Sequence, residues 1–213
     1  AVVFQGPESA QSLLRWVGNE RGLAPYPCWG TTRRLTAEGG ERERRDLAGS
    51  PDGDRYAPAE TDMPNRDQRR AYRGGWFWRE GEDDTLYSLE HLQECYRTSV
   101  GRNSNLLLGM VIDDQGLVPD ADRRRFAEFG GWVRDFNARV LAETAGQGDC
   151  LVLELPRPAT VDHLILMEDL GGGERVRQYR VEARTEGVWR EIAVGSCIGH
   201  KHIQPVAPTL CAA

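Results

Sequence analysis

The stretch SLEHLQECYRTSVGRNSNLLLGMVI, residues 88–112, decides the fold class, because a helix pattern in it passes directly into a strand pattern. Its first part carries apolar or aromatic side chains along one helical face, at Leu89, Leu92, Cys95, Tyr96 and Val100. We expect Ser88 to cap the start of this helix and Gly101 to end it.

The second part, residues 105–112, is an almost continuous apolar run without polar alternation. Such a run is typical of a strand in a parallel sheet, where both faces are covered. Residues 118–143 then show a second helix pattern, weakened in its middle by Gly130 and Gly131. Two short β-prone runs, at residues 1–4 and 13–17, come earlier in the chain. This order of strands and helices predicts an α/β architecture.

Residues 31–67, between these segments, are polar and rich in glycine and arginine, with no apolar period. We therefore expect a long surface loop there. The RERR run at residues 42–45 is interpreted as part of a solvated face rather than as a basic binding patch.

The character of the sequence changes after Gly148. Short alternating segments separated by Gly, Pro and Asp turns replace the helix patterns, and a β-sandwich is the best interpretation. Only four or five strands can be counted, fewer than the roughly seven of a complete sandwich. We place the boundary in residues 144–150, which predicts one domain over residues 1–147 and a second over 148–213.

Composition excludes several classes of protein. The net charge is −6, from 33 acidic and 27 basic residues, which does not favour a nucleic-acid partner. No apolar run approaches the roughly 20 residues that a membrane span needs. The first residues lack the basic start of a signal peptide and resemble a strand already in progress, so we expect the chain to begin inside a domain.

The cysteines and histidines do not predict a metal site or a disulfide framework. The five cysteines include no C-x-x-C pair, which favours scattered buried thiols over a zinc site or a disulfide framework. His200 and His202 lack a nearby acidic third ligand, so no metal site is predicted there.

Several sequence blocks have the order and approximate spacing of a known enzyme family. They are AVVFQGP (1–7), RWVGNERG (15–22), PAETD (58–62), GGWFWRE (74–80), SLEHLQECYRTSVGRNSNLLLG (88–109) and DDQGLV (113–118). Together they resemble the family 29 glycoside hydrolases, the α-L-fucosidases, in the subgroup that favours α-1,3 and α-1,4 branched fucose. Residues 165–183 and 189–203 resemble the β-sandwich appended to that family's catalytic domain.

This resemblance implies the C-terminal part of a (β/α)8-like barrel followed by a partial β-sandwich. It also implies a retaining glycosidase that uses two carboxyl groups. In the subgroup the general acid/base is the Glu that ends the RWVGNE block, which is Glu20 here. Trp16 and Val17 are expected to place Glu20 beside apolar surface, where desolvation raises a carboxyl pKa. The local sequence alone favours an exposed loop acid; the whole matched block favours the catalytic role.

The substrate-binding expectations concern four residues. Glu60 and Asp62 share a strand face two residues apart, and could bind sugar hydroxyls or hold a catalytic neighbour. The resemblance places Trp76 near the fucose pocket, although a core position is equally compatible, and Trp16 is expected at the same site. GGWFWRE is expected to be extended, with Trp78 on the same side as Trp76.

The chain also departs from the family pattern. The segment MPNRDQRRAYR, residues 63–73, is unusually long and basic. The family's nucleophile is an Asp in a Trp-x-Asp-Gly-like segment, which has no counterpart among these 213 residues. We therefore expect little or no activity from this polypeptide by itself.

The functional expectation is an α-L-fucosidase that acts on fucosylated glycans or glycoconjugates, with no metal or organic cofactor. The family implies secretion or a lysosomal location. The alternative is a non-catalytic carbohydrate-binding protein derived from a fucosidase, since binding needs no nucleophile. A truncated product that does not fold stably is a third interpretation.

Overall fold

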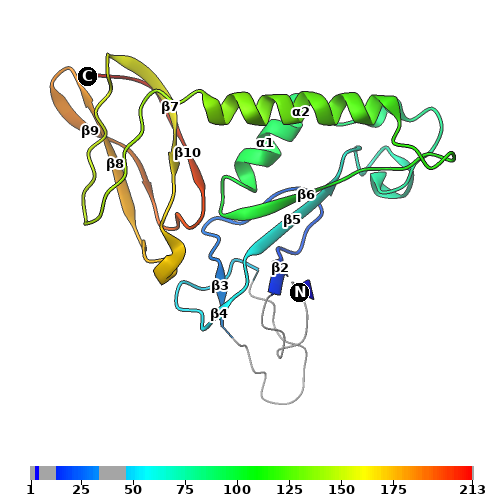
Figure 1. Ribbon diagram of the computed structural model, residues 1–213, viewed down its shortest axis with the longest axis horizontal. Coiled ribbons are helices and arrows are strands. Elements are labelled where there is room, and N and C mark those ends of the chain that lie inside the picture. The colour runs from blue at the N-terminus through cyan, green and yellow to red at the C-terminus, as the bar shows by residue number, and fades with distance from the viewer. Residues whose placement is uncertain (1–2, 5–12, 34–46, 213) are drawn as a thin grey trace.

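The computed structural model describes residues 3–4, 13–33 and 47–212. Its centre is a parallel sheet with the strand order β1-β2-β5-β6 (Figure 1). These strands are β1 (Val3–Phe4), β2 (Leu13–Trp16), β5 (Ala59–Pro64) and β6 (Ser104–Gly109). Each neighbouring pair is parallel, so all four strands end at the same edge of the sheet.

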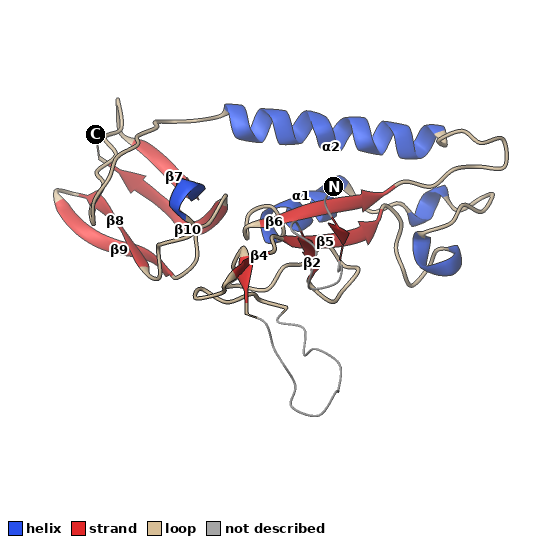
Figure 2. Ribbon diagram, turned by 60° about the horizontal axis from the view of Figure 1, so that its bottom comes forward, coloured by secondary structure: helices blue, strands red, loops and turns tan. Residues whose placement is uncertain are grey.

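Two helices, α1 (Leu89–Thr98) and α2 (Asp120–Ala138), cover one face of this sheet (Figure 2). The start of α1 is capped as expected, because the Ser88 hydroxyl accepts a hydrogen bond from the His91 amide at 3.2 Å. Gly130 and Gly131 do not interrupt α2. Both predicted helices and the parallel strand at 104–109 are therefore confirmed.

The core between sheet and helices explains why this face is covered. Met63 of β5 packs with Leu92 and Cys95 of α1, all at most 5% exposed, while Leu106 and Phe129 close the cluster from β6 and α2. Burying these apolar surfaces supplies most of the driving force for this packing.

The expectation that β6 is covered on both faces is wrong for the described residues. Leu106 and Leu108 face the helices, but Leu107 between them is 47% exposed. The period of two along a strand sends alternate side chains to opposite faces, and helices pack only on one of them.

The long surface loop expected at residues 31–67 is wrong on both sides of residues 34–46, which lie outside the described residues. Strand β3 (Thr31–Thr32) pairs antiparallel with β4 (Arg55–Tyr56), and β5 begins at Ala59. The strand character of β5 is hidden in the sequence by its polar residues, of which Glu60 and Asp62 lie on the face away from the helices and Thr61 is buried. The RERR run at 42–45 lies outside the described residues.

The C-terminal part holds two antiparallel strand pairs, at the left of Figure 1. In one, β7 (Ala159–Leu166) pairs with β10 (His202–Cys211); in the other, β8 (Tyr179–Thr185) pairs with β9 (Val188–Gly195). The prediction of an all-β segment with short strands is confirmed here, apart from one short 3-10 turn, Leu170–Gly172.

The cysteines and the helices also bear on the sequence-based expectations. Cys28, Cys95, Cys197 and Cys211 are buried free thiols, whereas Cys150 is exposed. Among the described residues, no helix is both long enough and apolar enough to cross a membrane.

Candidate active site

The candidate site lies where β2 and β5 end, at the shared carboxyl edge of the parallel sheet. Trp16 is the last residue of β2, and Glu20 lies in the loop that follows it. Asp62 lies near the end of β5, and Trp76 follows the short 3-10 turn Tyr72–Gly75 further along the chain. In parallel α/β folds this edge is where side chains converge on a ligand.

Two indole–carboxylate hydrogen bonds cross between these strands. The Trp16 Nε1–H donates to Asp62 Oδ1 at 2.6 Å, and the Trp76 Nε1–H donates to Glu20 Oε2 at 3.0 Å. Each bond joins a residue of β2 or its loop to a residue of β5 or the segment after it. The predicted site residues therefore contact one another in two pairs, although no bond joins one pair to the other among the described contacts.

Glu60 lies on the same sheet face as Asp62. Glu60 is opposite Trp16 on one neighbouring strand and opposite Asn105 on the other, and Asp62 is opposite Leu107. The alternating residues Ala59, Thr61 and Met63 are buried on the other face. The face with Glu60 and Asp62 is thus a half-buried acidic surface opposite the helix-covered face.

The environment of these two carboxyl groups favours their protonated forms. Burial raises the pKa of Asp62, the Trp16 hydrogen bond acts to lower it, and the charge of Glu20 raises it further. Burial also raises the pKa of Glu60, with the charge of Asp62 adding to the effect. Because Asp62 responds to the charge of Glu20, the three carboxyl groups form one electrostatic set.

Glu20 is exposed, and the expectation that it lies dry beside Trp16 and Val17 is wrong. Val17 points to the other side of the strand, where it packs with Ala24, Cys28 and Ala59 in a separate core cluster. The indole that contacts Glu20 is Trp76 instead.

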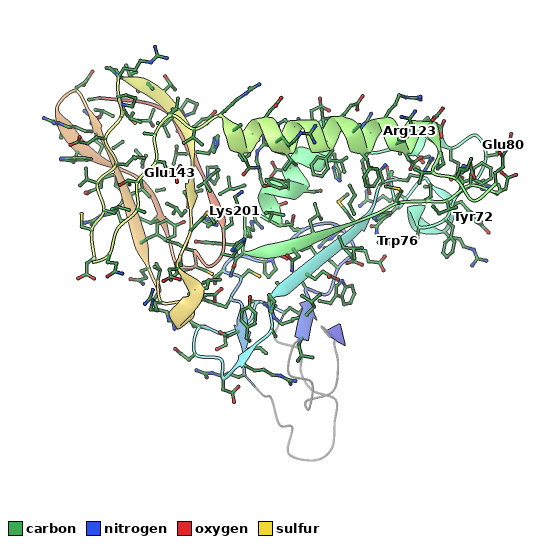
Figure 3. All side chains as sticks on the ribbon, in the orientation of Figure 1. Tyr72, Trp76, Glu80, Arg123, Glu143 and Lys201 are labelled. Carbon is green, nitrogen blue, oxygen red and sulfur yellow. The ribbon has the colours of Figure 1, made fainter. Side chains whose placement is uncertain are left out.

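Trp76 is half-buried, and its ring lies on the end of β6. A Cβ atom at Gly109 would come within 2.4 Å of Trp76 Cζ3, so the indole occupies space that only a glycine leaves free. The expected extended GGWFWRE segment is a turn, since Trp76 has helical backbone angles at the end of the 3-10 turn. Figure 3 shows Trp76 beside the ends of β5 and β6.

The second oxygen of each paired carboxylate accepts no hydrogen bond from another side chain in the part of the chain that the structure describes. These oxygens are Glu20 Oε1 and Asp62 Oδ2, while the other oxygen of each accepts from an indole. The arrangement can therefore offer one carboxyl oxygen from each pair to a bound hydroxyl or ether oxygen.

The histidines and possible metal ligands lie apart from this site. His91 stacks on Tyr87, and His163 stacks on Phe136. His202 is buried against Tyr26, 4.7 Å between ring centroids. In the part of the chain that the structure describes, no three metal-binding side chains come together.

One contact was missed by sequence reasoning. The Gln68 side-chain Nε2–H donates to the main-chain oxygen of Glu20 at 2.8 Å. The only signal for it was the unusual length of the segment 63–73 relative to the family pattern.

Comparison with known proteins shows which proteins this chain resembles. No family model matches the chain. A rice protein assigned as α-L-fucosidase 1 is 28% identical over 240 residues, which cover 95% of this chain and 44% of the rice protein.

Solved structures agree. A structure from Bacteroides thetaiotaomicron assigned as an α-L-fucosidase superposes with a TM-score of 0.86 at 32% identity, covering 95% of this chain and 46% of that one. A Ruminococcus gnavus family 29 fucosidase, solved in complex with fucose, superposes with a TM-score of 0.75 at 25% identity, over 94% and 46% of the two chains. The resemblance to family 29 α-L-fucosidases is confirmed, and the chain spans less than half the length of these relatives.

Proposed function

We propose that this chain is part of a retaining α-L-fucosidase in which Glu20 is the general acid/base. The observation that carries the proposal is the Glu20–Trp76 hydrogen bond at the carboxyl edge of a parallel sheet. The similarity of nearly the whole chain to α-L-fucosidases supplies the reaction class.

The fold supports a barrel segment. Strand β5, helix α1, strand β6 and helix α2 follow one another along the chain, and both helices pack outside the sheet. Consecutive β/α units of this kind are what the later part of a (β/α)8-like barrel contributes. The acidic face with Glu60 and Asp62 is then the interior of the barrel, and the edge with Glu20 is its catalytic mouth. Residues 148–213 form the partial β-sandwich that follows.

The chemistry assigned to Glu20 has two stages. Its protonated carboxyl first donates a proton to the departing glycosidic oxygen, while a nucleophilic carboxylate attacks the anomeric carbon of fucose. The resulting glycosyl ester is then hydrolysed by water, from which the Glu20 carboxylate removes a proton. Because Trp76 occupies Glu20 Oε2, the proton transfers are assigned to Oε1.

The remaining site residues are assigned to the sugar. Glu60 and the second oxygen of Asp62 accept hydrogen bonds from fucose hydroxyls, and the Trp16 indole holds Asp62 in place. The Trp76 ring offers a flat apolar surface to the C–H face of the pyranose. A fucosylated glycan or glycoconjugate is the corresponding substrate.

The test compares hydrolysis of 4-nitrophenyl α-L-fucoside by the 213-residue chain and by the longest natural polypeptide that contains it. We expect little turnover from the 213 residues and ready turnover from a polypeptide that also holds the nucleophile. In the active form, Glu20→Gln is expected to reduce kcat by about 10²–10⁴-fold.

Added azide sharpens this test. A small anion that needs no general base should restore turnover of the Glu20→Gln variant and give a fucosyl azide. Full activity of Glu20→Gln would overturn the assignment. Fucose binding without turnover by the longest polypeptide would instead support the non-catalytic carbohydrate-binding alternative.

A further inference from the structure

The segment of residues 63–73, which is unusually long and basic relative to the family pattern, lies against the loop that carries Glu20. It supplies Gln68 to the Glu20 main chain, and it leads directly into Gly75 and Trp76, whose indole holds the Glu20 carboxyl group. Gln68 of this segment and Trp76, three residues after its end, thus hold Glu20 at its backbone and at its side chain.

This segment is rigidly tied to its surroundings. The Asp67 amide donates to the Thr85 carbonyl at 2.8 Å and the Tyr87 amide donates to the Asn65 carbonyl at 3.0 Å, which joins it to the following stretch as a short antiparallel bridge. The Gln68 amide also donates to the Tyr87 hydroxyl at 3.3 Å. The backbone at Gln68 therefore has little freedom to move away from Glu20.

A buried arginine anchors the same segment to a helix. Arg66 is fully buried; it forms an ion pair with the buried Asp122 of α2 and donates to the Glu82 carbonyl at 2.6 Å. Gly75, at φ +80°, lies so close to the Arg66 carbonyl that a Cβ atom there would be 2.6 Å from its oxygen. The close contact between Gly75 and the Arg66 carbonyl therefore also constrains the position of Trp76, the next residue in the chain.

We propose that Gln68 is a positioning residue, whose side-chain amide holds the main chain at Glu20 so that the Glu20 carboxylate meets the Trp76 indole. The catalytic meaning of this contact rests on the proposed function, but the contact itself does not. Gln68 acts through the backbone of Glu20 and does not touch the reacting atoms. Without its hydrogen bond, the loop after β2 is still linked to β5 at its two ends, where the Val17 amide donates to the Glu60 carbonyl at 3.1 Å and the Gly22 amide donates to the Asp62 carbonyl at 3.0 Å.

The readout is the indole N–H resonance of Trp76 in the ¹⁵N-tryptophan-labelled chain. The chain holds six tryptophans, and the Trp76 resonance is identified by its loss in Trp76→Phe. In the wild type this resonance is expected to move as the pH changes, and Glu20→Gln is expected to remove the part of that movement that the Glu20 carboxyl group causes. Residual movement in Glu20→Gln reports the neighbouring groups Asp62, Glu60 and Asp67, and is subtracted.

Two variants test the contact, and a third serves as the matched control. Gln68→Ala removes the side chain, Gln68→Glu keeps its shape without the N–H donor, and Gln178→Glu makes the same charge change at an exposed position of the C-terminal part. We expect both Gln68 variants to lose at least about half of the pH-dependent shift of Trp76, on the scale of one lost hydrogen bond. The control is expected to keep all of it.

The outcomes separate this inference from the proposed function. The positioning role would be overturned if both Gln68 variants kept the full pH-dependent shift of the Trp76 indole resonance. It would also be overturned if the wild type showed no such shift. In an active polypeptide, Gln68→Glu is also expected to lower kcat about fivefold with KM unchanged, as the loss of one hydrogen bond implies. Absence of fucosidase activity together with the expected NMR result would overturn the function while leaving the positioning role intact.

Discussion

At the scale of single residues, the site depends on two indoles that each occupy one oxygen of a carboxylate. An N–H donor directed at a carboxylate favours the charged form, whereas burial favours the neutral form. For Asp62 burial is the larger influence, and its pKa is raised in spite of the Trp16 bond. The site thus holds neighbouring carboxyl groups in different environments, as acid–base chemistry requires.

The first prediction concerns how the Glu60 carboxyl group changes the stability of the folded chain with pH. Its pKa lies above the ordinary value of 4.5, so the folded chain binds this proton more tightly than the unfolded chain does. The stability from that proton is complete below pH 4.5 and is lost as the pH rises through the folded pKa. We therefore expect Glu60→Gln to have a higher Tm than the wild type at pH 7, with the difference shrinking toward pH 4.

Glu90 serves as the control, because its pKa is shifted in the opposite direction from that of Glu60. Its pKa is lowered by its own backbone N–H and by Ser88. Its contribution is present above pH 4.5 and is lost as the pH falls, so Glu90→Gln should lower Tm at pH 7. Thermal unfolding of both variants across pH 4–7 checks the pair, and equal pH dependence in the two would contradict it.

The sequence predicted which residues belong to the site better than it predicted their surroundings. Trp16, Glu20, Asp62 and Trp76 were all expected, and the structure joins them in two pairs, but their functional roles stay predictions. The expectation that Glu20 is buried was wrong, because the apolar Val17, three residues before it, faces the opposite side of the strand. Gln68 was missed because its contact is with a main-chain oxygen, which no sequence motif records.

At the scale of elements, the buried pair Arg66–Asp122 joins the segment after β5 to the first turn of α2. Removing one partner of a buried ion pair leaves an uncompensated charge, which is far costlier than losing an exposed pair. Arg66 is also 3.4 Å from Asp83, but that carboxylate is largely exposed and cannot replace a buried partner.

The second prediction compares two aspartates in the same turn of α2. Asp122→Asn is expected to lower the free energy of unfolding by about 3 kcal/mol, because the Arg66 charge remains buried. Asp120→Asn removes only the exposed pair with Arg123 and is expected to cost less than about 1 kcal/mol. Both aspartates lie near the helix N-terminus, so the difference between the variants excludes the helix dipole. Urea unfolding measures the free energy of unfolding of each variant, and an equal decrease in both would contradict the prediction.

Helices and apolar strands were predictable, whereas polar strands were not. The face of α1 and the run at β6 depend on local periodicity alone, and both were found where expected. Strand β5 was included in a loop because its second face carries the polar residues Glu60 and Asp62, which interrupt the apolar pattern of a strand. The coverage of β6 could not be predicted, since it depends on which other elements reach that face.

At the scale of the whole molecule, a polar seam joins the sheet to the C-terminal strands. Both Glu174 carboxylate oxygens accept from the Gly30 amide at 2.9 Å, and Oε1 also accepts from Asn103 Nδ2 at 2.5 Å. Tyr26 also joins the two parts. Its hydroxyl accepts a hydrogen bond from the Ser196 amide of the C-terminal part at 3.0 Å, and its ring stacks on His202. The two parts are therefore held by specific hydrogen bonds that depend on a few side chains.

The third prediction is that Glu174 holds this seam together. Glu174→Ala leaves the buried Gly30 amide without its acceptor, and an unsatisfied buried donor costs about 1–3 kcal/mol. The loss should speed amide hydrogen exchange at Gly30 and at His200, whose amide donates to Asn103 Oδ1 at 2.7 Å, because Asn103 also loses a partner. The control is Glu182→Ala on β8, where an exposed glutamate pairs with Arg180 at the surface. Since exposed pairs contribute little, the control should exchange like the wild type. Equal exchange at Gly30 in wild type and Glu174→Ala would contradict the role of Glu174 in this seam.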